Sequence, residues 1–95
     1  MQAMSTRQDR IRATLTERFA PSRLEVVDDS ARHAGHQGAA PGGETHYSVA
    51  MTAPCLRGLN RLARSRAVHD ALAREFASGL HALALSLRTP EEDGA

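Results

Sequence analysis

Histidines are concentrated in one part of this chain. Three of the five, His33, His36 and His46, fall between Asp28 and Tyr47, in a stretch rich in Gly, Ala and Pro. Neutral imidazole is the commonest metal ligand in proteins, and it titrates nearest to neutral pH. A long segment that carries such residues between two expected strands calls for a functional explanation. The residue types alone are compatible with any metal site or with none.

Position alone favours less reactive roles for the individual histidines. His33 and His36 fit a pair of solvated side chains as well as they fit a pair of metal ligands, because two histidines do not make a metal site. His81 has the parity of the leucines in an expected strand, which predicts a partly buried residue hydrogen-bonded at the sheet edge. His46 is expected on the solvent face of the sheet, and His69 on the polar side of a helix.

A second group of residues that could do chemistry is basic. All basic residues are arginine, and their one local concentration comprises Arg57, Arg61, Arg64, Arg66 and Arg74. Such runs usually form a solvated helical face. The functional alternatives are contact with phosphates or with the carboxylates of a partner. Acidic residues at 70 and 75 dilute the group, the net charge is only +1, and no nearby aromatic residue can stack bases, so partner contact is favoured over DNA.

Other functional classes lack support in the sequence. It contains no paired-carboxylate motif, no nucleophile with a base at recognisable spacing and no phosphate loop, so we expect a protein that is not an enzyme. The single cysteine, Cys55, cannot form an internal disulfide and is expected to be buried or half-buried. No apolar run predicts a signal peptide or a membrane span. These features favour a cytoplasmic bacterial protein that starts at Met1 or Met4.

Hydrophobic periodicity predicts the elements that would position these residues. Apolar residues at 11, 15 and 19 indicate one helix, and those at 68, 72 and 76 indicate a second. Arg7 does not belong to the apolar stripe of the first helix. Ser5 with Gln8, and Ser65, are the expected N-terminal caps. The expected elements are a helix over 5–19, strands over 24–28, 45–51 and 81–87, a loop over 30–43, a short helical turn over 56–62, a helix over 66–77 and a helix start over 89–92.

These elements predict an α/β (α+β) fold. The order α-β-β-α-α-β, with one apolar face on the strands, is typical of a two-layer sandwich in which helices cover one face of a three-stranded mixed sheet. The sequence contains no repeat, linker or second domain. We therefore expect a single domain over residues 1–95, with a core over about 5–89 and tails at 1–4 and 90–95.

In its motifs the sequence resembles the BolA family, over roughly residues 7–92. The matching segments follow the order and spacing of that family. They are LEVVDDS at 24–30, HAGH at 33–36, ETHY at 44–47, GLNRLARSRAV at 58–68, GLHALA at 79–84 and TPE at 89–91. The resemblance implies a small α/β sandwich similar to a type II KH domain, which agrees with the predicted order of elements.

The resemblance also implies a function. It predicts a non-enzymatic partner of a monothiol glutaredoxin that shares a [2Fe–2S] cluster with it, for iron–sulfur trafficking or iron homeostasis. The glutaredoxin cysteine and a glutathione thiol hold one side of such a cluster, so it is not intrinsic to the isolated chain. By the resemblance, His81 is one ligand and His33 is the other, with His36 as its competitor, whereas His46 has no assigned role as a ligand.

A DNA-binding transcriptional regulator is the alternative that the resemblance leaves open. Its helix-turn-helix-like segment, 54–78, would then contact DNA through four arginines: Arg57, Arg61, Arg64 and Arg66. The family usually has an aromatic residue at the position of Leu56 and a histidine at that of Ser65, and these departures weaken the case for DNA. We expect the free chain to be a monomer or a weak homodimer without membrane contact.

Overall fold

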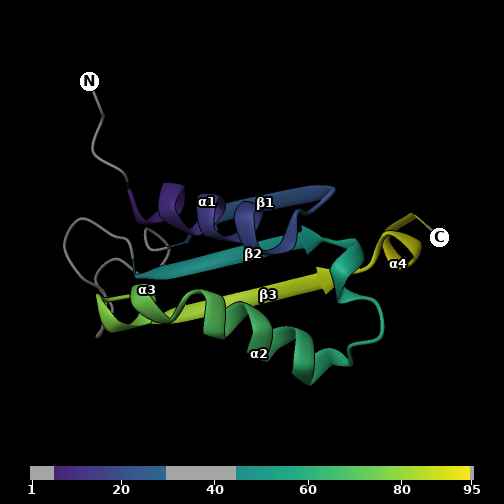
Figure 1. Cartoon of the computed structure of the whole chain (residues 1–95). Coiled ribbons are helices and arrows are strands. Elements are labelled where there is room, and N and C mark those ends of the chain that lie inside the picture. Colours follow the sequence, from purple (N-terminus) through teal and green to yellow (C-terminus); the bar gives the residue numbers. More distant parts are fainter. Residues whose placement is uncertain (1–5, 30–44, 95) are drawn as a thin grey trace.

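A three-stranded sheet with helices on one face organises the molecule (Figure 1). The computed structural model describes residues 6–29 and 45–94. The elements are, in chain order, α1 (Arg7–Phe19), β1 (Arg23–Asp28), β2 (His46–Thr52), η2 (Pro54–Leu56), α2 (Arg61–Ala71), α3 (Ala73–Ala77), β3 (Ala82–Arg88) and α4 (Pro90–Gly94). Their order agrees with the prediction, and the second long helix is divided into α2 and α3.

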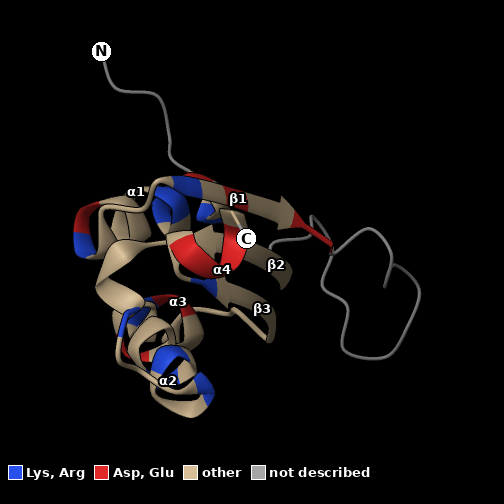
Figure 2. Ribbon diagram, turned by 90° about the vertical axis from the view of Figure 1, so that its right-hand side faces the viewer, with Lys and Arg blue, Asp and Glu red and all other residues tan. Residues whose placement is uncertain are grey.

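The strands lie side by side in the order β1-β2-β3, with β2 in the centre. β1 and β2 pair antiparallel, with Val26 opposite Val49, whereas β2 and β3 pair in parallel, with Val49 opposite Leu85. In a view turned by 90°, α1, α2 and α3 lie on one side of the sheet (Figure 2). The predicted two-layer fold with a mixed sheet is therefore confirmed.

The core lies between the helices and the sheet. Ile11 and Leu15 of α1 are buried, as are Val68 of α2 and Leu72 between α2 and α3. They belong to one hydrophobic cluster with the inward side chains of the strands, which include Val26, Tyr47, Val49 and Met51. The predicted apolar stripes are confirmed, with their terminal phenylalanines only partly buried.

Helix α1 begins later than the sequence predicts, because Thr6 rather than Ser5 caps it. The Thr6 hydroxyl accepts a hydrogen bond from the Asp9 amide at 3.1 Å, and the Asp9 carboxylate accepts one from the Thr6 amide at 3.4 Å. A carboxylate in the first turn also interacts favourably with the helix dipole. Gln8, the expected capping partner, instead donates to the Val26 carbonyl of β1 at 2.7 Å and ties the helix to the sheet. Ser5 lies outside the described residues.

Helix α2 begins earlier than predicted. The Asn60 side chain accepts a hydrogen bond from the Ala63 amide at 2.8 Å, so Asn60 is the N-cap and the prediction of Ser65 was wrong. Asparagine is among the strongest N-cap residues, and Ser65 falls inside the helix as a result. The expected turn over 56–62 is reduced to η2.

The chain after β2 and the chain after β3 differ in how well they follow the prediction. Cys55 was predicted to be buried or half-buried, and this prediction was wrong. It is exposed because η2 directs the neighbouring Leu56 into the core instead. Thr89 and Glu92 form the predicted capping box at the start of α4, with hydrogen bonds of 2.8 and 3.3 Å.

Within residues 6–29 and 45–94, no helix combines the length and apolar character needed to cross a bilayer.

Candidate functional site

Two histidines meet at one end of the sheet. The imidazole of His46, the first residue of β2, lies beside that of His81, which directly precedes β3. Their ring centroids are 5.5 Å apart, and the ring planes are tilted by 49°. His81 is exposed and therefore accessible to an approaching molecule, whereas His46 is half-buried. We refer to His46, His81 and Thr45 as the imidazole end.

Parallel pairing of β2 and β3 explains this proximity. His46 is in register with Ala82, and the amides of His81 and Ala82 both donate to the Thr45 carbonyl, at 2.8 and 3.0 Å. The Thr45 hydroxyl lies 2.9 Å from Nδ1 of His46. Strand patterns assign faces but not neighbours, so the sequence did not predict the contact. The helical crossover between the two strands, which is typical of parallel neighbours, was the available signal.

A tight turn places His81 at the surface. Gly79 has a φ of +128°, a conformation that residues with a side chain rarely adopt. A Cβ at this position would lie 3.1 Å from Nη2 of Arg7. The next residue, Leu80, is buried, and its amide donates to the Glu75 carbonyl at 2.8 Å. The turn therefore fixes the path from α3 into β3 just before His81.

Arg7 supports this turn from the first helix, although it falls off the apolar stripe of α1. It is only 8% exposed, and Nη1 donates to the Glu75 carboxylate and to the Ser78 hydroxyl, each at 2.8 Å. A hydrogen bond from Arg10, together with the charges of both arginines, lowers the pKa of Glu75 below its usual range. The buried carboxylate is thus compensated by two guanidinium groups.

The two predicted loop ligands, His33 and His36, lie outside the described residues. The residues that flank them are described. The Asp29 amide donates to the His46 carbonyl at 2.7 Å, and the Thr45 carbonyl accepts from the amides before β3. Segment 30–44 therefore leaves and re-enters the described structure at the imidazole end.

The imidazole end supplies nitrogen donors but no thiolate from its own residues. Within the ranges 6–29 and 45–94, no group of three or more His, Cys, Asp or Glu side chains is placed to hold a metal ion. An exposed imidazole can still ligate a metal whose remaining ligands come from elsewhere. This donor set fits a shared site better than a structural zinc site, which requires four protein ligands.

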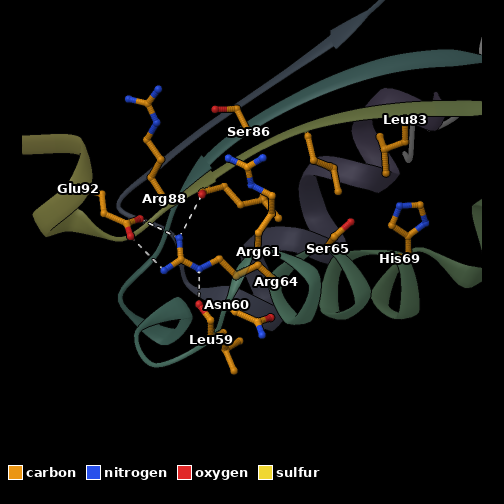
Figure 3. A pocket seen from close by; sticks show the side chains of 12 residues that line it. Leu59, Asn60, Arg61, Arg64, Ser65, His69, Leu83, Ser86, Arg88 and Glu92 are labelled. Atoms are coloured by element: carbon orange, nitrogen blue, oxygen red, sulfur yellow. Dashed lines mark hydrogen bonds and ion pairs between the residues drawn. The ribbon is translucent and has the colours of Figure 1, made fainter.

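The opposite end of the sheet holds arginines that are paired with glutamates. Nε of Arg57 donates to the Glu91 carboxylate at 2.8 Å, and Nη1 of Arg64 donates to Glu92 at 2.7 Å (Figure 3 shows the second pair). Hydrogen bonds from these arginines lower the pKa of Glu91 and of Glu92 to about 2. We refer to these four residues as the arginine end. Two of the four predicted partner- or DNA-binding arginines are therefore engaged by this chain's own carboxylates.

The other two predicted arginines, Arg61 and Arg66, are exposed on α2. In the described part of the chain, neither side chain forms a hydrogen bond or an ion pair. Arg61 lines a cavity of about 900 Å³ between α2 and β3, to which Arg66 does not contribute (Figure 3). His69 also lines this cavity. As expected from its place on the polar side of the helix, it is exposed, and its ring stacks on Phe76 at a centroid distance of 5.0 Å.

Sequence comparison relates the chain to one family. Residues 15–92 match the family described as BolA-like protein. The chain is 43% identical to human BolA-like protein 1 over 82 residues, which cover 86% of this chain and 57% of that protein. It is 38% identical to SufE-like protein 1, chloroplastic/mitochondrial, of Arabidopsis thaliana over 94 residues, which cover 95% of this chain and 25% of that protein. The chain thus spans little more than half of the first relative and a quarter of the second.

Solved structures agree with this relationship. The BolA domain of SufE1 from Arabidopsis thaliana superposes with a TM-score of 0.83 at 39% identity, covering 95% of this chain and 99% of that one. BolA1 from the same plant superposes with a TM-score of 0.84 at 36% identity, covering 95% and 98%. Both comparisons include nearly all of each chain, so they concern the whole arrangement of sheet and helices.

Proposed function

Because this chain belongs to the BolA-like protein family, we propose that it is a non-enzymatic partner of a monothiol glutaredoxin and shares a [2Fe–2S] cluster with it. One observation carries the proposal. His81 is exposed beside His46, at the end of the sheet where segment 30–44 begins and ends. The resemblance assigns one ligand to His81 and the other to that segment, whose described flanks, Asp29 and Thr45, lie at the imidazole end.

The structure supports different roles for the histidines in this proposal. The His81 ring is exposed on a backbone held by the Gly79 turn, so we assign it as a ligand. His46 is half-buried and contacts Thr45, so we assign it a structural role and no bond to the metal. His33 is four residues beyond Asp29, and four residues extend at most about 14 Å, which keeps it within reach of this end. His36 stays the competitor.

Ligation by histidine would give the shared site two properties. A bound cluster supplies one-electron chemistry, and replacing thiolates by imidazoles raises its reduction potential. An imidazole must also be neutral to act as a ligand, so protonation of His81 would weaken its bond to the metal. The shared site is therefore expected to be more sensitive to acid than a site held by thiolates alone.

Spectroscopy of a reconstituted mixture tests the proposal. The chain is mixed with a monothiol glutaredoxin, iron, sulfide and glutathione, and its absorption and circular dichroism spectra are compared with those of the glutaredoxin alone. We expect new circular dichroism bands, because exchange of a thiolate for an imidazole changes the ligand field. If the spectra match those of the glutaredoxin alone, the proposal is wrong.

Single substitutions test the ligand assignment. We expect His81→Ala to shift the spectrum of the mixture back toward that of the glutaredoxin. The matched control is His46→Ala, which removes an imidazole 5.5 Å away and should leave the bands in place. Comparing His33→Ala with His36→Ala identifies the ligand in segment 30–44. A His81→Ala mixture that matches the wild type contradicts the assignment, even if the two proteins still associate.

The alternative, a DNA-binding regulator, has one supporting observation: Arg61 and Arg66 are exposed on α2. Because Arg57 and Arg64 already pair with Glu91 and Glu92, the local positive field is weaker than the sequence suggests. We therefore rank this function second. A salt titration of duplex DNA binding tests it, since phosphate contacts produce steep salt dependence. No binding at low salt would remove this alternative.

A further inference from the structure

β3 is an edge strand with an unpaired side. The sheet order β1-β2-β3 leaves β3 with a single neighbour. In a strand, alternate residues direct their backbone groups to the same side. The Ala82 amide donates to Thr45 at the start of β2, and the Arg88 carbonyl accepts from Ala53 just after its end. The even-numbered residues of β3 therefore face β2, and Leu83, Leu85 and Leu87 direct their amides and carbonyls outward.

Only one of these outward groups is satisfied within the described structure. Nη1 of Arg64 donates to the Leu87 carbonyl at 3.3 Å, at the carboxyl end of the strand. The amides and carbonyls of Leu83 and Leu85 have no partner among the described residues. An open row of donors and acceptors of this kind is a template for an added strand.

The cavity between α2 and β3 lies along this open edge. Its lining combines the leucines of β3 with Leu59, Ser65 and His69 from the helix side. It holds three arginines and one carboxylate, and that carboxylate already pairs with Arg64. Arg61, which is exposed and has no ion pair within the described residues, leaves the cavity with an excess of positive charge. An acidic occupant would complement this charge.

Charge also decides between two occupants of the edge. A second copy of this chain could pair its own β3 with this one. That arrangement would bring the arginines of two cavities together, and like charges in contact cost free energy. An extended segment with acidic side chains would satisfy both the backbone edge and Arg61.

We propose that the outer edge of β3 and the facing side of α2 bind an extended acidic segment of another protein as an added strand. Backbone hydrogen bonds to Leu83 and Leu85 supply affinity, and carboxylates opposite Arg61 supply specificity, as in other cases of strand addition. This inference does not depend on the proposed function, because it involves neither His81 nor His46.

The probe is a capped peptide of alternating glutamate and valine, and a lysine–valine peptide is the charge control. Amide exchange measured by NMR reports the added strand. With saturating glutamate peptide, we expect at least about tenfold slower exchange of the Leu83 and Leu85 amides, because ladder hydrogen bonds protect amides. The Ala84 amide already faces β2 and should change little. Unchanged exchange at Leu83 and Leu85 would overturn the proposal.

Two further comparisons separate strand addition from a general electrostatic contact. N-methylation of alternate peptide amides should abolish binding in one register and preserve it in the other, whereas equal binding of both methylated peptides argues against a strand. Arg61→Ala should weaken binding about two- to fivefold at low salt, the range of exposed ion pairs. Arg66→Ala is the matched control on α2 and should bind normally.

The remaining outcomes contradict the proposal directly. Equal binding of the lysine peptide would exclude charge complementarity. Slower exchange at Leu83 and Leu85 that rises with the concentration of the chain alone would identify a second copy as the occupant. Slower exchange of the Leu83 and Leu85 amides caused by duplex DNA, and not by the peptide, would assign the cavity between α2 and β3 to nucleic acid.

Discussion

The two ends of the sheet use the same residue pair, arginine with glutamate, in different surroundings. At the Gly79 turn, which leads into the imidazole end, the Arg7 and Glu75 side chains are 9% and 11% exposed. At the arginine end, the side chains of Arg57 and Glu91 are 56% and 61% exposed. Breaking a buried pair leaves an uncompensated charge, whereas an exposed pair contributes little because water and salt screen it. Burial, and not the pairing itself, therefore makes such a contact structurally important.

The largest expected effect comes from removing the buried partner. Arg7→Ala leaves the Glu75 carboxylate with Arg10 alone and removes the donors to Ser78. We expect it to lower the free energy of unfolding by about 3 kcal/mol, measured by urea denaturation at neutral pH. Arg12→Ala, an exposed change on the same helix, should stay within about 0.5 kcal/mol of wild type. Equal losses in the two variants would contradict the structural role of Arg7.

Glycine substitutions at the two ends should give the next largest effect. Gly79→Ala forces a side chain into a φ of +128° and against Arg7, so we expect a loss of about 2 kcal/mol. Gly58 at the other end has a φ of +80° and open space around its Cβ position, so Gly58→Ala should cost about 1 kcal/mol. Urea denaturation ranks the two variants. A larger loss at Gly58 would show that the turn before His81 is not the tighter one.

Acid should produce the smallest effect and should separate the two ends by their response to salt. A carboxylate whose pKa is lowered in the folded state stabilises the fold fully above its unfolded pKa, about 4.3, and loses this contribution as pH falls through the folded value. This applies to Glu75 and, with a pKa lowered to about 2, to Glu92. Glu92 is exposed, so water and salt screen its ion pair and we expect its contribution to be the smaller one.

Unfolding measurements between about pH 5 and pH 2, at low salt and at about 1 M NaCl, check this expectation. Glu75→Gln should reduce the acid-induced loss of stability at both salt concentrations. The effect of Glu92→Gln should disappear at high salt. An effect of Glu75→Gln that high salt also abolishes would place that carboxylate in a screened, exposed environment, against the structure.

Local pattern predicted the elements better than it predicted their ends. The apolar spacing of Ile11 and Leu15, and the alternation in the strands, were sufficient for the order of the elements, and the mixed sheet was expected from that order. The start of α2 was missed because Asn60 and Ser65 are both good N-cap residues, and only packing against the sheet selects between them. Cys55 was misplaced for a related reason: the geometry of η2 decides which of two neighbouring side chains enters the core.

The candidate site was less predictable, because its contacts join residues far apart in the chain. The prediction of His81 as a ligand rests on the family motif, since its position in an expected strand favoured a structural role, and it stays a prediction. Its contact with His46 depends on which strands are neighbours. The burial of Arg7 depends on Glu75, 68 positions away, and the sequence carries no local signal for such a pairing.

The backbone contacts around Thr45 have a consequence for how this fold can vary. The Thr45 carbonyl accepts two amides, and the Asp29 amide bonds to His46, so the base of segment 30–44 is closed by the sheet itself. The entropy of closing a loop grows slowly with its length, and a doubling costs only about 0.6 kcal/mol. Insertions and substitutions within the segment should therefore change the free energy of unfolding little, while His81 keeps its position. Natural variation can retune one prospective ligand without disturbing the other.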